Sequence, residues 1–550
     1  MDINSIKSWL KDRCNFTFLI ILVLGAFIRI LNLIATKGQA LWWDEADYLA
    51  YAKNLAGFDI GWIIAEAHNS IYPYLAALIF KFGLGELAVK FLLQVVPSIL
   101  SIVLVYFLSN EMYKDKRIGV VVSFLMTFFW IHLFNTSRFH VDILGLFFGL
   151  ISIYIFWKGF EKKEKIFGRV DQKWTIPLTA LFAVLAYSTR RGYFLFGIFI
   201  ATFILLTRSW KEISKDKYNW IGLILGIVLI LFVEKVIFIS GLGAVGEQYF
   251  HEELPISFAP LSVFKSFFKI GGTISTIPFY LFWVGLILII SKLALSFGYI
   301  KKDALSKANL LNLLIIAITL IFFMVVLRSP PEDVSAEPRW YLPLAFSAFA
   351  CIGLISVTLL DSIKKQYNHL GLIIIIALIL IFTISGYSQY KIADEQVKSK
   401  VASYAGIREA SLFLKEIASK EDKILTLSQP QVEYYSERST LNARVWAGDP
   451  RQLGTSAHFD ATLLKIQETP SLRFLVIAFL EGAYPEWACN CNNWAQSNIM
   501  EIPFMDTRVE LNTGQQDIKP EISYGNLTFK LITIKNEVFV YEISRSDTNA

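Results

Sequence analysis

Apolar stretches of about 17–25 residues recur from residue 16 to residue 388 of this chain, separated by shorter polar segments. An α-helix needs about 20 apolar residues to cross the hydrocarbon core of a bilayer, so the pattern predicts about eleven membrane-spanning helices. They are expected at residues 16–35, 86–108, 118–134, 141–158, 174–189, 192–207, 218–239, 276–296, 308–327, 340–360 and 369–388.

Lysine and arginine in the connecting segments predict the orientation of these helices. Basic residues precede the first span and follow every even-numbered span, whereas the other connections are poorer in them. Cytoplasmic loops of membrane proteins carry an excess of positive charge. We therefore expect a cytoplasmic N-terminus and a C-terminal tail outside. The basic residues after the second and fourth spans include Lys114, Lys116, Arg117, Lys158, Lys162, Lys163 and Arg169.

The tail after residue 388 has a different pattern. Residues 403–420 have helical spacing, residues 431–436 resemble a turn or short helix, and the short apolar runs 423–427, 473–479 and 537–543 favour strands. About 150 residues are enough to bury a core of their own. The sequence thus predicts a membrane domain at 1–388, with a first outer loop at 36–85, and an extracytoplasmic mixed α/β domain at 389–550.

Composition supports a membrane protein and excludes several other classes. The chain has 550 residues, of which 55% are apolar and 18% charged, and its mean hydropathy is +0.50. These values exclude a single soluble globule, a disordered chain and a collagen. The net charge of +6 is small and gives no indication of nucleic-acid binding. The four cysteines form no disulfide framework: Cys14 and Cys351 lie in or beside apolar spans, and Cys489 and Cys491 are too close for an easy mutual disulfide.

The densest group of acids follows the first span. Trp42 and Trp43 precede Asp44 and Glu45, and Asp47 comes two residues later. Tryptophan suits the membrane interface, but the acids are not needed for anchoring. Adjacent carboxylates repel each other, so they favour either a general base or a bridging divalent cation. The alternative is the acidic first turn of a solvated helix.

Other polar residues also fall on the predicted outer side. His68 and Tyr72 belong to the first outer loop, where a histidine is often only a surface residue. Arg138 and Asp142 flank the turn between the third and fourth spans, and they would be more informative as a pair facing an outer cavity. A charge at a helix end can instead reach the interface, so burial alone does not establish function there.

Three further arginines interrupt or begin apolar segments on that side. They are Arg190, Arg191 and Arg339. The guanidinium group presents a rigid fork of donors that suits phosphate or pyrophosphate, although anchoring to lipid head groups is the alternative. The sequence contains no Walker loop, dinucleotide-binding fingerprint, zinc-protease motif or nucleophile elbow, which argues against nucleotide-driven transport.

The order of these motifs resembles the GT-C superfamily of polytopic glycosyltransferases, in particular the protein O-mannosyltransferases and lipid A aminoarabinose transferases. The resemblance covers most of residues 16–390. It departs from the family at His68-Asn69-Ser70-Ile71, where a His/Lys-Pro-Pro-Leu stretch is usual, and at Trp340, which interrupts Arg-Tyr-Leu-x-Pro. The motifs that carry it are Asp44, Glu45 and Tyr48; His68, Tyr72 and Pro73; Arg138 and Asp142; and Arg339, Tyr341, Leu342 and Pro343.

The resemblance implies a reaction. A polyprenyl-phosphate-linked sugar would enter from the outer leaflet, and its phosphate would be held first by Arg339, with Arg190, Arg191 and Arg138 as further candidates. Asp44 would act as base on an acceptor hydroxyl, supported by Glu45, and the sugar would be transferred with inversion. The acceptor would be a protein, lipid or glycan. Further substrate contacts are expected from His68, Tyr72, Asp142 and Tyr341.

The need for a metal and two other function classes stay open at this point. The cofactor is unknown, and Asp44 and Glu45 are the residues that would hold a divalent cation. Transporters commonly have matched halves and charges near the midplane, whereas here the charges gather at the outer helix ends. A receptor or anchored scaffold would need fewer spans and would give the acids of the first outer loop no purpose.

Overall fold

The computed structural model describes residues 3–64, 68–238, 265–268, 276–296, 303–326, 338–367, 370–444, 446, 456–478, 499–502, 507–510, 516–517, 520–536 and 538–546. The chain divides into two compact units, which are described separately below. Unit 1 comprises Met1–Lys37, Asn69–Tyr72 and Leu84–Lys398. Unit 2 comprises Gly38–His68, Pro73–Gly83 and Ser399–Ala550. Most of the predicted outer segment 240–275, together with Cys489 and Cys491, lies outside the described residues.

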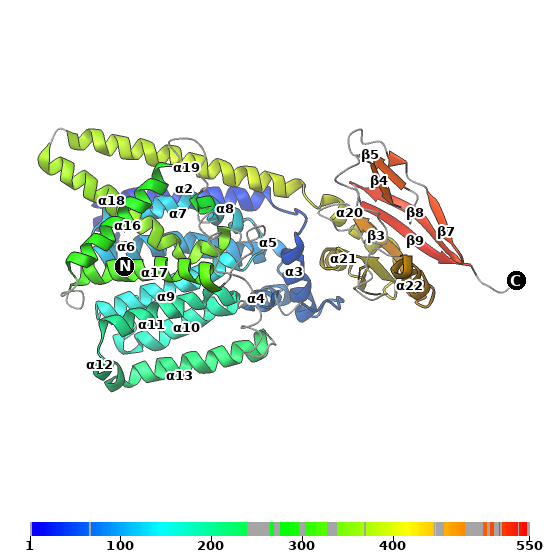
Figure 1. The fold of residues 1–550 in the computed structure, drawn as a ribbon, viewed down its shortest axis with the longest axis horizontal. Coiled ribbons are helices and arrows are strands. Elements are labelled where there is room, and N and C mark those ends of the chain that lie inside the picture. The colour runs from blue at the N-terminus through cyan, green and yellow to red at the C-terminus, as the bar shows by residue number, and fades with distance from the viewer. Residues whose placement is uncertain are drawn as a thin grey trace. The chain divides into compact units, whose positions relative to one another are not determined.

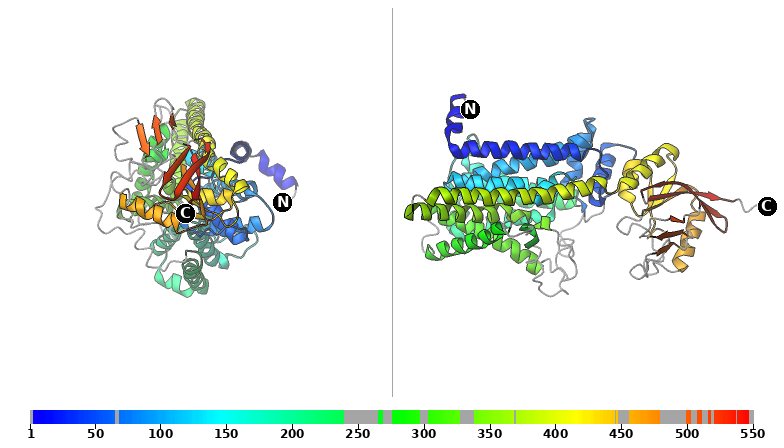
Figure 2. Two further views of the ribbon diagram at one scale, coloured as in Figure 1. Left: turned by 90° about the vertical axis from the view of Figure 1, so that its right-hand side faces the viewer. Right: turned by 90° about the horizontal axis from the view of Figure 1, so that it is seen from above.

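Unit 1 is built of long apolar helices that run side by side (Figures 1 and 2). Every segment predicted to span the membrane is helical over most of its described residues. Short π- or 3-10-helical turns extend several of these helices. The main helices are α2 (Arg13–Ala35), α6 (Val96–Tyr113), α7 (Lys116–Phe128), α8 (Trp130–Thr136), α9 (Asp142–Phe156), α10 (Thr175–Thr189), α11 (Leu195–Thr207), α13 (Lys217–Phe232), α16 (Ile277–Leu295), α17 (Ala304–Ile321), α18 (Ala345–Gln366) and α19 (Leu370–Ala402).

Eight helices in the described part of the chain are long and apolar enough to cross a membrane, and the pair α7–α8, bent by 52°, would make a ninth. Judged by helix length and apolar composition in the described residues, the prediction of about eleven crossings is therefore too high. The difference lies in residues 174–189 and 192–207, because α10 has only 15 residues and Arg191–Thr207 is likewise short. The chain is nevertheless a multi-pass membrane protein, as predicted.

Small residues allow close packing within unit 1. A Cβ atom at Gly285 in α16 would overlap the backbone carbonyl of Cys351 in α18. Larger side chains fill the remaining space, including the fully buried Phe156, Phe196 and Trp157. Apolar side chains on the outer helices remain exposed, as on α13, where Ile221, Ile224 and Val228 are exposed and do not line the pocket described below. Such faces suit contact with lipid, where small residues rather than hydrophobicity drive helix packing.

Unit 2 contains a six-stranded mixed sheet in the order β2-β1-β3-β9-β8-β7. Strands β2, β1 and β3 pair in parallel, and β3, β9, β8 and β7 pair antiparallel. A separate three-stranded sheet consists of β4 (Ile499–Ile502), β5 (Thr507–Glu510) and β6 (Gln516–Asp517). The strands of the larger sheet are β1 (Lys423–Thr426), β2 (Thr440–Asn442), β3 (Leu472–Ala478), β7 (Glu521–Tyr524), β8 (Leu527–Lys535) and β9 (Val538–Arg545).

Helices cover both faces of this sheet. Along β3, Phe474 and Val476 pack with α20, whereas Leu475 and Ile477 pack with α22, as the alternation of a strand requires. The predicted strands near 423–427, 473–479 and 537–543 are confirmed in their described residues. The helices of unit 2 are α3 (Trp43–Ala56), α20 (Ala405–Ile417), α21 (Gln429–Ser436) and α22 (Ser456–Gln467), and α4 (Ile71–Lys81) contributes residues to both units.

Candidate functional site

A buried polar cluster in unit 1 gathers around Asp142, the first residue of α9. Its Oδ1 atom accepts a hydrogen bond of 2.7 Å from Nη1 of Arg190, at the end of α10. Its Oδ2 atom lies 2.8 Å from Nδ1 of His140 and 3.7 Å from Nε of Arg339. The other ring nitrogen of His140 lies 2.6 Å from Nη1 of Arg339. Residues from three distant parts of the sequence thus form one network.

Neighbouring groups fix the orientation of this network. The hydroxyl of Tyr193 donates to the backbone oxygen of Asp142, and Nε2 of Gln94 donates to the backbone oxygen of His140. The guanidinium of Arg190 also lies over the ring of Trp340, 5.1 Å from its centroid. The side chain of Asp142 is only 1% exposed, whereas that of Arg190 is 24% exposed. Asp142 therefore orients an arginine that a ligand can still reach.

Arg191 points to a different place from its neighbour Arg190. Its Nη2 atom lies 3.5 Å from Oε2 of the buried Glu234, which also accepts a hydrogen bond from the hydroxyl of Tyr187. Its guanidinium carbon lies 4.4 Å from the centroid of the Phe238 ring. Glu234 and Tyr187 were not predicted, because each lies within an apolar run and only the fold brings them to Arg191.

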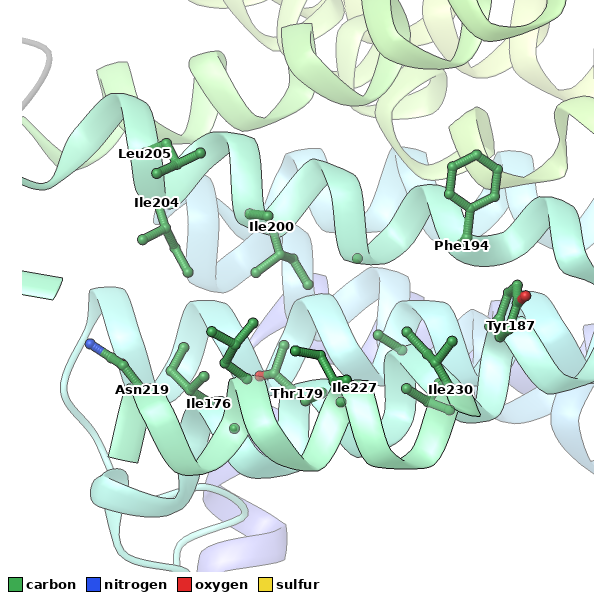
Figure 3. Close-up of a pocket in the computed structure, with 18 of the residues that line it drawn as sticks. Ile176, Thr179, Tyr187, Phe194, Ile200, Ile204, Leu205, Asn219, Ile227 and Ile230 are labelled. Atoms are coloured by element: carbon green, nitrogen blue, oxygen red, sulfur yellow. The ribbon is translucent and has the colours of Figure 1, made fainter. Parts of the chain in front are cut away.

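An apolar pocket of about 710 Å³ begins beside this second group and lies between α10, α11 and α13 (Figure 3). Tyr187 and Phe194 lie toward one end, and Asn219 lies at the other. Most of the lining side chains between them are aliphatic, such as Ile200, Ile204, Ile227 and Ile230. Arg191 belongs to the lining at the Tyr187 end. The shape and chemistry suit a long hydrocarbon chain with a polar group at one end.

Three other predicted residues of unit 1 are buried, and the contacts described for them are with residues other than Asp142. Arg138 lies over the ring of Phe134, 5.6 Å from its centroid. Tyr341 is fully buried and its ring centroid lies 4.5 Å from that of Phe323. Tyr72 is also fully buried. The structure thus joins Asp142 to Arg190 and Arg339 in the described contacts, and it adds His140, which the sequence presents as an unremarked residue between Arg138 and Asp142.

The acids that follow the first span begin helix α3 in unit 2. Asp44 and Glu45 lie in the first turn, where the helix dipole favours negative charge. The Glu45 side chain is fully buried and its Oε2 atom lies 2.7 Å from Nζ of Lys400. The same oxygen accepts a hydrogen bond of 3.3 Å from the backbone N–H of Trp42, while Asp44 is half-buried. The two adjacent carboxylates therefore have different surroundings.

Asp47, a further acid of α3, contacts the predicted residue His68. Oδ2 of Asp47 lies 2.7 Å from Nδ1 of His68, and Oδ1 accepts a hydrogen bond of 2.6 Å from the indole of Trp62. The side chain of Asp47 is 7% exposed, whereas that of His68 is 44% exposed. The carboxylate thus fixes one ring nitrogen of a histidine that remains accessible.

The described residues contain no group of three or more histidine, cysteine, aspartate or glutamate side chains arranged to hold a metal ion. In particular, the described contacts of Glu45 are with a lysine and a backbone amide. A cation bridging Asp44 and Glu45 would have to displace Lys400 from the second carboxylate.

Sequence and structure comparisons relate this arrangement to known proteins. Residues 68–238 match the family model of the dolichyl-phosphate-mannose-protein mannosyltransferases. No curated protein sequence matches the chain significantly.

Two solved structures share the fold over most of the chain. ArnT from Cupriavidus metallidurans, bound to undecaprenyl phosphate, superposes with a TM-score of 0.59 at 10% identity over 95% of this chain and 97% of its own. The oligosaccharyltransferase AglB from Archaeoglobus fulgidus, in complex with an inhibitory peptide and a dolichol-phosphate, gives a TM-score of 0.55 at 12% identity over 85% of this chain and 70% of its own. At such identities the likeness to these structures concerns the fold.

The fold expected from the resemblance is thereby confirmed: the chain is a helical multi-pass membrane protein with a mixed-sheet domain after the helices, similar in fold to ArnT over most of both chains. The similarity to the dolichyl-phosphate-mannose-protein mannosyltransferases concerns residues 68–238.

Proposed function

We propose that this protein transfers a sugar from a polyprenyl phosphate to a hydroxyl group of a protein, lipid or glycan on the extracytoplasmic side of the membrane, with inversion at the anomeric carbon. The observation that carries the donor side of this proposal is the divergence of two neighbouring arginines. Arg190 enters the polar cluster of Asp142, whereas Arg191 lines the end of the apolar pocket. A lipid phosphate needs a polar, basic site for its phosphate next to an apolar site for its chain, and the two arginines lie in these two environments.

In this proposal the donor phosphate is held by Arg339 and Arg190, with Arg191 and Arg138 as further candidates. Arg190 is oriented by Asp142 but partly exposed, so it can receive a phosphate oxygen without rearranging. The polyprenyl chain lies in the pocket between α10, α11 and α13. Burial of each methylene-sized group contributes about 0.8 kcal/mol, which gives a chain of several isoprene units substantial affinity.

For the acceptor side we propose Asp44 as the general base. It removes the proton of the acceptor hydroxyl while the oxygen forms a bond to the anomeric carbon, and the bond from that carbon to the phosphate oxygen breaks. The leaving polyprenyl phosphate keeps the electron pair, and the arginines stabilise its charge. His68 is proposed as a further contact to substrate, and Tyr72, Tyr341 and Asp142 as residues that shape the site. Glu45 supports Asp44 from its pair with Lys400.

The sidedness of the reaction is supported by the distribution of lysine and arginine among the connecting segments. A cytoplasmic N-terminus puts the first outer loop and the tail on the extracytoplasmic side. A polyprenyl-phosphate sugar needs no nucleotide there, in agreement with the absence of nucleotide-binding motifs from the sequence.

Sugar transfer by the purified full-length protein in liposomes tests this proposal. A panel of radiolabelled polyprenyl-phosphate sugars, including the mannose derivative, is offered with a crude acceptor extract. We expect label to move from lipid to acceptor with the wild type and not with Asp44→Asn, which should still bind donor. Normal turnover by Asp44→Asn would exclude Asp44 as the base.

The donor side is tested separately by binding. Arg339→Ala should weaken donor binding by about 1.5–3 kcal/mol, the range for a charge-assisted hydrogen bond. If the affinity for donor is unchanged in Arg339→Ala, the phosphate must be bound by Arg190 or Arg191 instead. Absence of transfer from every donor in the panel would contradict the proposed reaction.

A further inference from the structure

The acid-rich start of α3 is fastened to residues 400–404, at the end of α19 and just beyond it. The indole Nε1 of Trp42 donates a hydrogen bond of 2.5 Å to Oγ of Ser403, and that of Trp43 donates one of 3.0 Å to the hydroxyl of Tyr404. The hydroxyl of Ser403 in turn donates to the backbone oxygen of Lys400. Both tryptophans before Asp44 are therefore held by hydroxyl groups that lie about 360 residues away in the sequence.

A buried ion pair completes this attachment. The side chains of Glu45 and Lys400 are both 0% exposed, and Nζ of Lys400 lies 4.4 Å from the centroid of the Trp42 ring. Glu45 also caps the helix through the backbone N–H of Trp42. The ammonium group thus neutralises the carboxylate, stacks on the preceding tryptophan and supports the first turn of the helix.

The three carboxylates of this segment consequently differ in accessibility. Glu45 is buried against Lys400, and Asp47 is buried against Trp62 and His68. Asp44 retains part of its exposure. A base must reach the proton that it removes, so Asp44 is the acid of this segment best suited to that role.

We propose that Lys400 is a positioning residue for the transfer reaction: it withdraws Glu45 into a buried ion pair and fixes the first turn of α3, so that Asp44 is held ready to act on the acceptor. This inference rests on the proposed function, in which Asp44 is the base. It gives the residues that follow the last predicted span a part in catalysis, and it assigns Glu45 a supporting rather than a chemical role.

The physics of buried ion pairs makes this role testable. Removing one partner leaves an uncompensated charge in a dry place, whereas removing both avoids that penalty. In Lys400→Met, the Glu45 carboxylate loses its counter-charge and is expected to move toward water or another cation. The first turn of α3, which carries Asp44, is expected to move with it. A displacement of about 1 Å costs a catalytic group about 100-fold in rate.

The experiment compares Lys400→Met, Glu45→Gln and the double variant with the wild type, using radiolabelled polyprenyl-phosphate mannose or whichever donor of the panel the wild type accepts. Rates are expressed per molecule that binds donor. We expect kcat to fall about 100-fold in Lys400→Met with donor KM nearly unchanged, and to recover most of this loss in the double variant. Lys398→Met is the matched control, because the Lys398 side chain is 74% exposed and its ammonium lies 2.6 Å from Oδ2 of Asp394. It should behave as the wild type.

Each other outcome has a distinct meaning. A normal kcat per donor-binding molecule in Lys400→Met, even with less folded protein, would make the pair merely structural and overturn the inference. If the double variant is as inactive as Asp44→Asn, Glu45 itself takes part in the chemistry. This result would also overturn the inference that Lys400 only positions Asp44. No transfer by the wild type from any donor would refute the proposed function, and the positioning role with it.

Discussion

Nη1 of Arg190 lies 2.7 Å from Oδ1 of Asp142, although the two residues are 48 positions apart in the sequence. The carboxylate is buried and is shared with Arg339 and His140. A charge in such a place is tolerated only where partners neutralise and hydrogen-bond it. Asp142 is therefore as much a structural element of unit 1 as a candidate substrate contact.

Replacement of Asp142 by alanine should lower the stability of the protein by about 3–5 kcal/mol, because it removes a buried carboxylate and leaves the partly buried Arg190 and Arg339 without their counter-charge. The free energy of unfolding can be measured by titration with a denaturing detergent. The matched control is Asp361→Ala, whose carboxylate lies 2.6 Å from Nη1 of Arg117 but is 52% exposed. That pair should contribute only about 0–1 kcal/mol. Equal losses in the two variants would show that burial of the Asp142 network does not govern its contribution.

The long apolar runs made the helices of unit 1 predictable, and short apolar runs marked β1, β3 and β9. Strands such as β7, where exposed and half-buried residues alternate, gave no comparable signal. The two segments that account for the lower number of candidate spans in the described part of the chain, 174–189 and 192–207, were correctly predicted as helices, but α10 and Arg191–Thr207 are shorter than the other candidate spans. Arg29 shows a similar gap: it lies within the first apolar run, yet it is fully buried and donates to the backbone oxygen of Thr127 beside the α7–α8 bend.

The candidate site was predictable residue by residue but not as a network. Arg190, Arg339 and Asp142 were each conspicuous as charges at the ends of apolar segments. Their pairing depends on the packing of α9 and α10 and the turn at Pro338–Leu344, and the sequence instead suggested Arg138 as the partner of Asp142. His140 and Arg339 are 199 residues apart in the sequence. Lys400 resembled any basic residue in a last helical turn, and only the fold brings it to Glu45.

Filling the apolar pocket should impair the use of long-chain donors selectively. Gly226 lines the pocket on α13, and a Cβ atom there would meet only Ala180 at 3.7 Å, so Gly226→Leu should fold normally while occupying the space. Exclusion of about two methylene groups costs about 1.6 kcal/mol. The KM for a long polyprenyl-phosphate sugar should therefore rise about 15-fold, with little change for a short-chain analogue.

The control for this prediction is Val228→Leu, two residues along the same helix. Val228 is 55% exposed and is not among the residues that line the pocket. Its KM values for both donors should match those of the wild type. If Gly226→Leu keeps the wild-type preference for chain length, the polyprenyl chain does not bind in this pocket.

Glu433 in α21 gives unit 2 a predictable dependence on pH. Burial raises the pKa of its carboxyl above the ordinary value of 4.5, although the side chain and backbone N–H of Thr440 donate hydrogen bonds that oppose the shift. A carboxyl with a raised pKa in the folded protein binds its proton more tightly there than in the unfolded chain. Its stabilising contribution is therefore complete below about pH 4.5 and is lost as the pH rises through the raised value.

Glu433→Gln cannot ionise and should abolish this part of the pH dependence. The stability of the variant relative to the wild type should thus increase as the pH rises from about 4.5 to 7. Hydrogen exchange of the α21 amides in the full-length protein measures the local stability at each pH. The control is Glu437→Gln at the end of the same helix, where the carboxylate lies 2.7 Å from Nζ of Lys415 and is 27% exposed. If Glu433→Gln and the wild type respond to pH in parallel, burial does not control the ionisation of Glu433.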